Sequence, residues 1–284
     1  MFTILPEFET KYFYTIDLGK KFIQNKEIII VGLVRNLGHI LYENVASIVN
    51  LNLYCPKLHF FLYENDSTDD TVSILQKCKK DFPNFAYQTD SLNLKSFDHK
   101  NIDSTKDLKS LERTQNLAKH RNICLNYVKE YFPNSDFTIV MDMDFQKFSM
   151  DGLLNSFGWL YNNYADALVG NSFEFKKIFS SNSQNLWNYD CWAYRGSWWE
   201  DLQKYTNHYE YDPMFWFGVW QPPVGSEPIQ VNSAFGGIGI YKTKQYITVK
   251  YDGYDCEHVC LHKNLKYKYP DYKLCINPSQ MMLF

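Results

Sequence analysis

The segment Phe137-Thr-Ile-Val-Met-Asp142-Met-Asp144-Phe145 joins a short apolar run to two carboxylates that stand one residue apart. The apolar run is rich in β-branched residues and follows the turn-forming residues 133–136, so it predicts a buried strand. Ligands of α/β proteins bind beyond the carboxyl ends of such strands, and residues i and i+2 of an extended segment point the same way. Asp142 and Asp144 therefore predict a site for Mn²⁺ or Mg²⁺ that is shared with substrate phosphates. The alternative is a pair of solvated aspartates at a strand end.

The composition limits the classes of protein to consider. The chain has 284 residues, of which 45% are apolar and 18% aromatic, and its net charge is −3. This length can bury a substantial core, and the acidic balance gives no basis for general affinity for nucleic acid. The seven cysteines include no Cys-x-x-Cys pair, which favours a reducing, cytoplasmic setting. No apolar run is long enough to span a membrane, so we expect no transmembrane segment, while peripheral membrane contact stays open.

Strands and helices alternate in the first half of the predicted structure. Apolar runs predict strands at residues 27–34, 59–63, 85–87 and 137–141. Helical spacing of apolar residues predicts helices at residues 40–51, 72–78 and 117–131, the second of them capped by Ser67 or Thr68. Residues 1–26 are expected to have little regular structure, and residues 89–112 to form a loop. The alternation favours an α/β fold with a mixed, mostly parallel central sheet and helices on both faces.

The second half is less regular. Strands are expected at residues 167–169, 231–241 and 273–278, and a helix is expected from Asp255. Residues 186–220 are crowded with tryptophan and tyrosine, which could form a platform for a sugar acceptor or could simply be core. We expect one domain over residues 1–284, with a nucleotide-sugar-binding half at 27–145 and an acceptor-binding and catalytic half at 146–284.

Five motifs follow one another along the chain. They are Val34-Arg35-Asn36, Tyr63-Glu64-Asn65-Asp66-Ser67-Thr68-Asp69-Asp70-Thr71, His120-Arg121-Asn122, Asp142-Met143-Asp144, and Asp255-Cys256-Glu257-His258 with His262. Together they resemble the nucleotide-sugar-dependent glycosyltransferases of the GT-A (Rossmann-like nucleotide-binding) fold. More narrowly, the chain is similar to the group that includes the fungal capsule-associated α-mannosyltransferases and their bacterial and viral relatives.

The resemblance implies donor-binding residues at the strand ends. Glu64 stands where the family's acidic residue accepts hydrogen bonds from the nucleotide base or ribose, and Asp66 belongs to the same motif; a helix-capping acidic loop is the alternative. Arg35 follows a strand and could meet the base or the diphosphate, or else form a surface salt bridge. Arg121 could neutralise phosphate, because a guanidinium pairs with phosphate in bidentate fashion.

The metal shell would be built around Asp142 and Asp144. The resemblance implies that the metal bridges the diphosphate of the donor and stabilises the leaving nucleoside diphosphate. His262 is the first candidate to complete the shell and His258 the second, and a histidine ligand would favour Mn²⁺ over Mg²⁺. Each histidine could instead be a packed residue of the helix.

The catalytic base is expected at the start of the late helix. Glu257 is the first candidate to deprotonate the acceptor hydroxyl and Asp255 the second, if the reaction inverts the sugar configuration. If the reaction retains configuration, these acids would bind sugar hydroxyls instead; acids favoured by the helix macrodipole are the alternative. Gly236 and Gly237 are expected to line the pocket for the donor sugar or the acceptor.

The expected function is that of a metal-dependent hexosyltransferase. It would move a hexose from UDP- or GDP-hexose to a glycan or lipid-linked saccharide, in the cytoplasm, with or without peripheral contact with a membrane. A sugar nucleotidyltransferase or another metal-dependent nucleotide-sugar enzyme is one alternative, and a sugar-binding module without activity is another. A two-metal enzyme acting on nucleic acid is disfavoured, because the sequence has no basic stripe.

Overall fold

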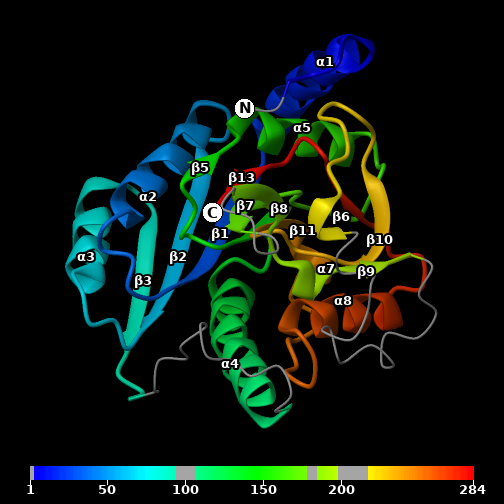
Figure 1. The fold of residues 1–284 in the computed structure, drawn as a ribbon. Coiled ribbons are helices and arrows are strands. Elements are labelled where there is room, and N and C mark those ends of the chain that lie inside the picture. Colours follow the sequence, from blue (N-terminus) through cyan, green and yellow to red (C-terminus); the bar gives the residue numbers. More distant parts are fainter. Residues whose placement is uncertain (1–2, 94–106, 178–183, 198–216) are drawn as a thin grey trace.

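The fold is built on a nine-stranded mixed sheet with helices on both faces (Figure 1). The computed structural model describes residues 3–93, 107–177, 184–197 and 217–284. The described helices are α1 (Pro6–Ile23), α2 (Leu41–Val49), α3 (Thr71–Asp81), α4 (Asp107–Tyr131), α5 (Met150–Tyr161), α7 (Thr243–Tyr246) and α8 (Glu257–Lys268), with 3₁₀ turns η1 (Asn50–Leu53) and η3 (Cys191–Ala193). The described strands are β1 (Glu27–Val34), β2 (Lys57–Asn65), β3 (Phe85–Asp90), β4 (Phe137–Met141), β5 (Lys147–Phe148), β6 (Ala167–Val169), β7 (Phe173–Lys177), β8 (Gln184–Asn188), β9 (Arg195–Gly196), β10 (Ile229–Ser233), β11 (Ile238–Lys242), β12 (Leu274–Ile276) and β13 (Met282–Leu283).

The order of strands in the large sheet is β3-β2-β1-β4-β11-β6-β12-β10-β9. β3, β2, β1 and β4 are parallel, and β11 then pairs antiparallel with β4, with Ile238 opposite Met141. The four parallel strands therefore end at the same edge of the sheet, where Arg35 follows β1 and Asp142 follows β4. The prediction of an α/β fold with a mixed central sheet is confirmed. Its four adjacent parallel strands come from the first half of the chain, and β6 and β12 form a further parallel pair.

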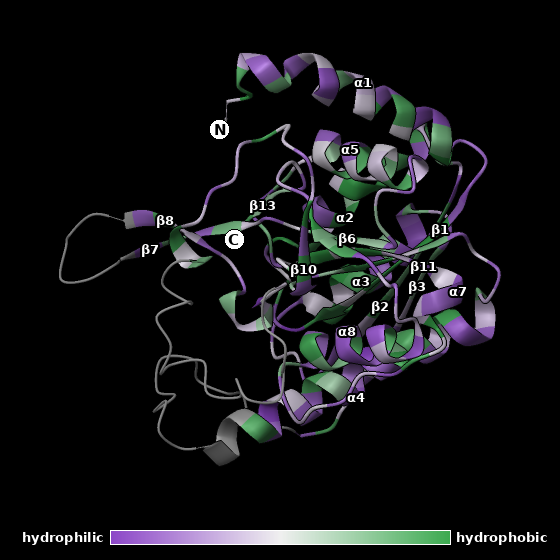
Figure 2. Ribbon diagram, turned by 90° about the vertical axis from the view of Figure 1, so that its right-hand side faces the viewer, coloured by the Kyte–Doolittle hydropathy of each residue, from purple (hydrophilic) through white to green (hydrophobic). Residues whose placement is uncertain are grey.

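Alternate residues of the central strands face the two helical layers. Ile28 and Ile30 of β1 pack on one side with α1, α2, α3 and α5, whereas Ile29 and Val31 pack on the other side with α4 and α8. All four of these side chains are fully buried. A strand that is covered on both faces needs apolar residues at every position, which explains why the run of isoleucines in β1 was read correctly from the sequence. Figure 2 shows the apolar strands between the two helical layers.

Two expectations about helices were wrong. Residues 6–23, expected to lack regular structure, form α1, which starts with a proline, has acidic residues in its first turn and has lysines in its last turn. Its buried face is held by packing on α5, and packing, rather than intrinsic propensity, supplies most helical stability in proteins. α4 begins at Asp107, inside the region expected to be a loop, while residues 94–106 of that region lie outside the described residues.

Two expectations about local geometry were also corrected. α3 starts at Thr71 rather than after Ser67 or Thr68, and the Asp69 carboxylate accepts a hydrogen bond from the Thr71 amide at 3.0 Å. The strand expected at residues 231–241 is two strands, because Gly236 and Gly237 adopt φ values of 58° and 74°. These left-handed conformations turn the chain between β10 and β11, and glycine adopts them at no steric cost.

A smaller sheet lies beside the end of the chain. Its strand order is β5-β13-β7-β8, so it joins the segment after Asp144 to the C-terminal residues. The ring of Phe284 stacks on that of Tyr189, which follows β8, with ring centroids 3.7 Å apart. This contact fixes the chain that leads from β8 into η3. Within the described part of the chain, no helix combines the length and the apolar character that crossing a membrane requires.

The close contact between α1 and α5 predicts that one methyl group added at this interface lowers the stability of the protein. A Cβ atom on Gly158 would lie 2.0 Å from the carbonyl oxygen of Thr15. We expect Gly158→Ala to destabilise the protein by about 1–3 kcal/mol, because overpacking outweighs the better helix propensity of alanine. Urea unfolding measures the change, with Lys21→Ala on the exposed face of α1 as control. Equal stability of Gly158→Ala and wild type would show that the two helices do not pack as described.

Candidate active site

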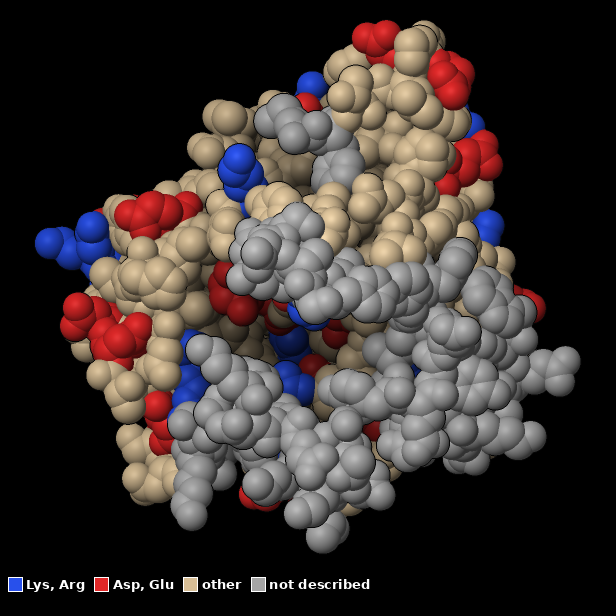
Figure 3. All heavy atoms as spheres, viewed as in Figure 1, with Lys and Arg blue, Asp and Glu red and all other residues tan. Residues whose placement is uncertain are grey.

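A pocket of about 210 Å³ opens beyond the ends of β1 and β4. The space-filling view shows acidic and basic side chains gathered inside this hollow (Figure 3). The residues that line it are Leu33, Arg35, Leu37, Arg113, Leu117, Arg121, Asp142, Asp144, Tyr189, Asp190, Trp192, Phe235, Cys256, Glu257 and His258. They come from both halves of the chain. Because the pocket lies beyond the carboxyl ends of β1 and β4, it is at the place in an α/β sheet where ligands bind.

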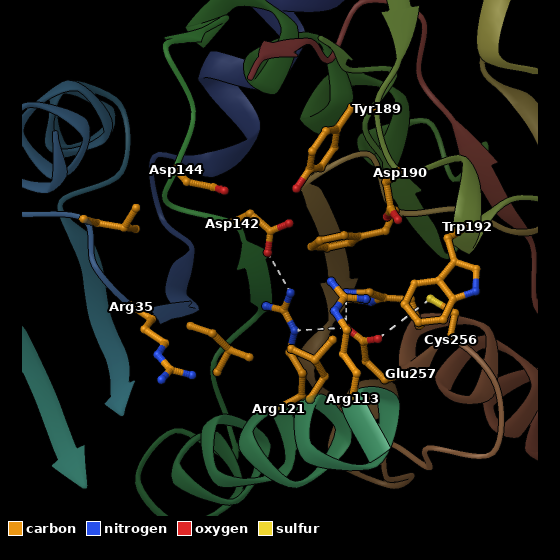
Figure 4. Close-up of a pocket in the computed structure, with 15 residues that line it drawn as sticks. Arg35, Arg113, Arg121, Asp142, Asp144, Tyr189, Asp190, Trp192, Cys256 and Glu257 are labelled. Carbon is orange, nitrogen blue, oxygen red and sulfur yellow. Dashed lines mark hydrogen bonds and ion pairs between the residues drawn. The ribbon is translucent and has the colours of Figure 1, made fainter. Parts of the chain in front are cut away.

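Asp142 and Asp144 stand side by side on one wall of the pocket (Figure 4). The backbone amide of Asp142 donates to the carbonyl oxygen of Gly237 at 2.8 Å, which ties the end of β4 to the turn before β11. Although the Asp144 side chain faces the opening, the surrounding protein displaces water from it. This desolvation and the neighbouring charge of Asp142 together raise the pKa of Asp144 to about 6.

This donor set fits a divalent cation. Two adjacent carboxylates repel each other, and a cation between them would relieve that repulsion. No described residue donates a side-chain hydrogen bond to Asp144, so its oxygens are available as ligands. Carboxylate oxygens are hard ligands that suit Mg²⁺ and Mn²⁺. Asp142 and Asp144 are therefore the residues that would hold the metal.

Arg121 is a buried cation beside these carboxylates. Its Nη2 donates to Oδ1 of Asp142 at 2.6 Å, and its Nε lies 3.7 Å from Oε1 of Glu257. The residue is 5% exposed, and its Nε and Nη1 have no hydrogen-bond partner among the described residues. Buried donors without partners are costly, so this guanidinium can bind a further anion that enters the pocket.

The N-terminus of α8 brings Glu257 to the pocket. Glu257 is the first residue of α8 and is 4% exposed. Burial raises the pKa of its carboxyl group above the ordinary value, while the neighbouring charge of Arg121 partly offsets that effect. The next residue, His258, also lines the pocket, and its ring stacks on Phe235 with centroids 3.6 Å apart.

Two predicted site residues have structural partners instead. Asp255, the second candidate base, accepts two hydrogen bonds from Nη2 of the fully buried Arg195, at 3.0 and 2.9 Å, and does not line the pocket. His262, the first candidate among histidine metal ligands, is fully buried, and its ring nitrogens lie 2.9 Å from the hydroxyls of Ser233 and Tyr241. The structure does not bring His262 to the two aspartates, because both nitrogens are already engaged below the pocket.

The motifs after β1 and β2 bind to each other. The amide of Asn36 donates to Oγ of Ser67 at 3.0 Å, and the amide of Thr68 donates to Oδ1 of Asn36 at 2.8 Å. Asn36 itself has φ of 55°, a conformation that asparagine tolerates better than most residues. This connection between the two loops holds the adjacent Arg35 at the pocket wall, beyond the end of β1.

Other donor-binding candidates lie near the pocket without lining it. Glu64 is 2% exposed and accepts from the amide of Ser67 at 2.7 Å, which closes the turn after β2. Asp66 accepts from the amides of Leu92 and Asn93, both at 2.8 Å, and so joins the ends of β2 and β3. Their contact with a nucleoside stays a prediction.

Gly236 and Gly237 likewise do not line the pocket. They form the turn between β10 and β11, and the carbonyl oxygen of Gly237 accepts a hydrogen bond from the amide of Asp142. Phe235, which directly precedes them, is the residue of this turn that reaches the pocket.

Two charged residues of the pocket were missed by sequence reasoning. Arg113 lies on the first part of α4, next to the region expected to be a loop, and its guanidinium carbon is 5.0 Å from the centre of the Trp192 ring. Asp190 was noticed only as part of an aromatic stretch. The spacing of Arg113, Leu117 and Arg121 by four residues was the available signal, since it places all three on one helix face. The expected acceptor platform is only partly visible, because residues 198–216 lie outside the described part of the chain.

The pKa of Asp144 predicts how pH acts on the metal-free protein. An unfolded aspartate has a pKa of about 3.9, so a raised pKa in the folded state means that stability falls as pH rises from about 4 to about 6. We expect Asp144→Asn to be more stable than wild type by about 1 kcal/mol near pH 7.5, a figure that allows for solvent screening, and no more stable near pH 4. Thermal unfolding without metal measures this, with the exposed Asp271→Asn as control. An equal gain at both pH values would contradict the raised pKa.

Comparisons with known proteins agree with this geometry. Residues 27–283 match a family described as Cryptococcal mannosyltransferase 1. The comparison with curated proteins gave no match. Among solved structures, the mannosyltransferase PcManGT from Pyrobaculum calidifontis in complex with GDP-Man and Mn²⁺ is similar with a TM-score of 0.51 and 11% identity. The aligned part covers 98% of this chain and 65% of that one.

A second similar structure is TarS 1-349 from S. aureus in complex with UDP, with a TM-score of 0.51 and 12% identity. The aligned part covers 91% of this chain and 60% of that one, so the present chain spans less than two thirds of the length of both structures. At these identities the likeness shows a shared fold, which is the GT-A fold of glycosyltransferases. The family match extends over most of the chain, and the chain belongs to the glycosyltransferase family described as Cryptococcal mannosyltransferase 1.

Proposed function

We propose that this protein is a metal-dependent glycosyltransferase that moves a hexose from a nucleoside-diphosphate sugar to a glycan or a lipid-linked saccharide. One observation carries the proposal. A single pocket holds a pair of adjacent carboxylates, Asp142 and Asp144, a buried arginine with unfilled donors, Arg121, and a further buried carboxylate, Glu257. These are the groups that a diphosphate leaving group and a hydroxyl nucleophile require.

The donor diphosphate would bind between the aspartates and the arginines. Arg121 would donate to phosphate oxygens through Nε and Nη1, which have no partner among the described residues. Arg35 lines the same pocket from the end of β1 and would contact the diphosphate or the base. A metal held by Asp142 and Asp144 would supply Lewis-acid stabilisation of the charge that develops on the leaving diphosphate.

Glu257 would remove the proton from the attacking hydroxyl of the acceptor. A carboxylate is a better proton acceptor when its pKa is raised, and burial raises the pKa of Glu257. Arg121 lies between Asp142 and Glu257 (Figure 4), so it would separate the base from the leaving group. If transfer retains the sugar configuration, Glu257 would bind a sugar hydroxyl instead of acting as base.

Both UDP and GDP donors are compatible with the fold. The structure of PcManGT is in complex with GDP-Man and Mn²⁺, and that of TarS is in complex with UDP. A soluble or lipid-linked saccharide would then reach the anomeric carbon from the side of Trp192 and Glu257. A cytoplasmic site of action, with or without peripheral membrane contact, stays a prediction.

Ligand-dependent stability tests the proposal directly. Thermal unfolding is measured with GDP, UDP, ADP and CDP, each with and without Mn²⁺. We expect one nucleotide to raise Tm only in the presence of Mn²⁺, because a ligand that binds the folded state alone stabilises it by mass action, by about 2.7 kcal/mol at 100 times Kd. Asp144→Ala should fold and lose the shift. The absence of a shift for every nucleotide with Mn²⁺ would refute the proposal.

A pair of variants separates the two acids at the start of α8. Glu257→Gln should lower kcat by about 100-fold to 10,000-fold while leaving Kd for the nucleoside diphosphate nearly unchanged, because the base acts only on the acceptor proton. Asp255→Asn should instead lower the free energy of unfolding by about 3–5 kcal/mol, because it breaks the buried ion pair between Asp255 and Arg195. Steady-state kinetics and urea unfolding measure both. Loss of turnover in Asp255→Asn without loss of stability would reverse these roles.

A further inference from the structure

Asp190 is a pocket carboxylate to which the proposed mechanism gives no role. It follows β8 and precedes η3, and its backbone has φ of 59° and ψ of 41°, in the left-handed region that few residues other than glycine adopt. Its neighbours Tyr189 and Trp192 also line the pocket. In Figure 4, Tyr189 and Asp190 enter the pocket on the side opposite Arg113 and Arg121.

The carboxylate of Asp190 lacks a hydrogen-bond donor among the described residues. Its backbone carbonyl accepts from the amide of Ala193 at 3.1 Å, but no described side chain or amide donates to the carboxylate. Burial, followed by the charges of Asp142 and Glu257, raises the pKa of Asp190 well above the ordinary value. A polar group in such surroundings costs free energy until a partner arrives, and a ligand that enters the pocket can supply the donor.

The surroundings of Asp190 indicate the chemistry of that ligand. A phosphate or carboxylate group placed against Asp190 would be repelled by Asp190 and Glu257. Arg121, which has unfilled donors, lies between Asp142 and Glu257. An uncharged hydroxyl group can donate to Asp190 without such repulsion. The ring of Trp192 beside it offers the apolar surface on which the C–H groups of a sugar pack. The ligand group is therefore an uncharged polyol.

We propose that Asp190 hydrogen-bonds to a hydroxyl group of the hexose carried by the donor, and so is a specificity-determining residue that selects a neutral, hydroxylated sugar. The inference rests on the proposed function, because the diphosphate must bind at Asp142, Asp144 and Arg121 for the attached sugar to lie between Asp190 and Glu257. It gives the donor sugar its own contact, separate from those of the diphosphate.

Two substitutions remove the carboxylate without straining the backbone. Asp190→Gly deletes the side chain at a left-handed position that glycine adopts freely. Asp190→Asn removes the charge, keeps the shape, and is the other residue that tolerates this conformation. Alanine is avoided, because it would add backbone strain to the loss of the contact. Asp271→Asn, on an exposed residue outside the pocket, is the matched control.

The experiment compares two classes of ligand by isothermal titration calorimetry in the presence of Mn²⁺. The ligands are GDP and GDP-mannose, and UDP and UDP-glucose. For the pair that wild type binds, we expect Asp190→Gly to weaken the sugar nucleotide about tenfold, the effect of a hydrogen bond to a charged group, and Asp190→Asn to weaken it less. Affinity for the nucleoside diphosphate should stay within about twofold, and Tm of the free variants should not fall.

Each outcome decides between the two proposals. Equal losses for the nucleoside diphosphate and the sugar nucleotide, or a loss for neither, would overturn the role of Asp190 and leave the proposed function standing. A marked fall in Tm of the free Asp190→Asn protein with unchanged sugar-nucleotide affinity would make Asp190 a structural residue. Failure of wild type to bind any nucleoside diphosphate with Mn²⁺ would refute the proposed function, and the role of Asp190 with it.

Discussion

The repulsion between Asp142 and Asp144, held side by side at the end of β4, is the constraint around which the pocket is arranged. Four acids and three arginines line the pocket: Asp142, Asp144, Asp190 and Glu257, with Arg35, Arg113 and Arg121. Arg121 compensates part of the negative charge by pairing with Asp142 at 2.6 Å, whereas no cationic side chain among the described residues pairs with Asp144. Opposite charges attract more strongly where protein displaces water, and Asp142 and Asp144 are the residues that would hold a divalent cation in this pocket.

The rest of the fold holds these charges in place. β4 lies between β1 and β11, and the carbonyl of Gly237 accepts from the amide of Asp142, so the metal motif cannot shift along its strand. Arg195 binds Asp255 in a fully buried pair just before α8, which positions Glu257 at the first turn of that helix. α4 presents Arg113 and Arg121 on one face. Buried pairs, strand register and the hydrogen-bonded loops after β1 and β2 together position the chemistry.

The sequence predicted those parts of the molecule whose signal is local. The strands β1 and β4 are short, β-branched and apolar, and both were located because a buried strand requires that composition. The position of Asp142 and Asp144 at the pocket was predicted because they stand one residue apart at a strand end. α1 was missed because its stability comes from packing on α5, and His262 was misjudged because its partners Ser233 and Tyr241 are distant in sequence. Asp190 gave no signal, since its role depends on a left-handed backbone conformation and on neighbours across the pocket.

Conservation of the fold does not fix the ligand. PcManGT, a complex with GDP-Man, and TarS, a complex with UDP, share this architecture with the present chain at 11% and 12% identity. One arrangement of strands is thus compatible with different bound nucleotides, while side chains choose the base and the sugar. In the proposed function the diphosphate would contact Asp142 and Arg121, whereas Asp190 and Glu257, the carboxylates proposed to face the sugar, come from segments after residue 184. Selection of the sugar would then depend on the second half of the chain, where the regular α/β alternation ends.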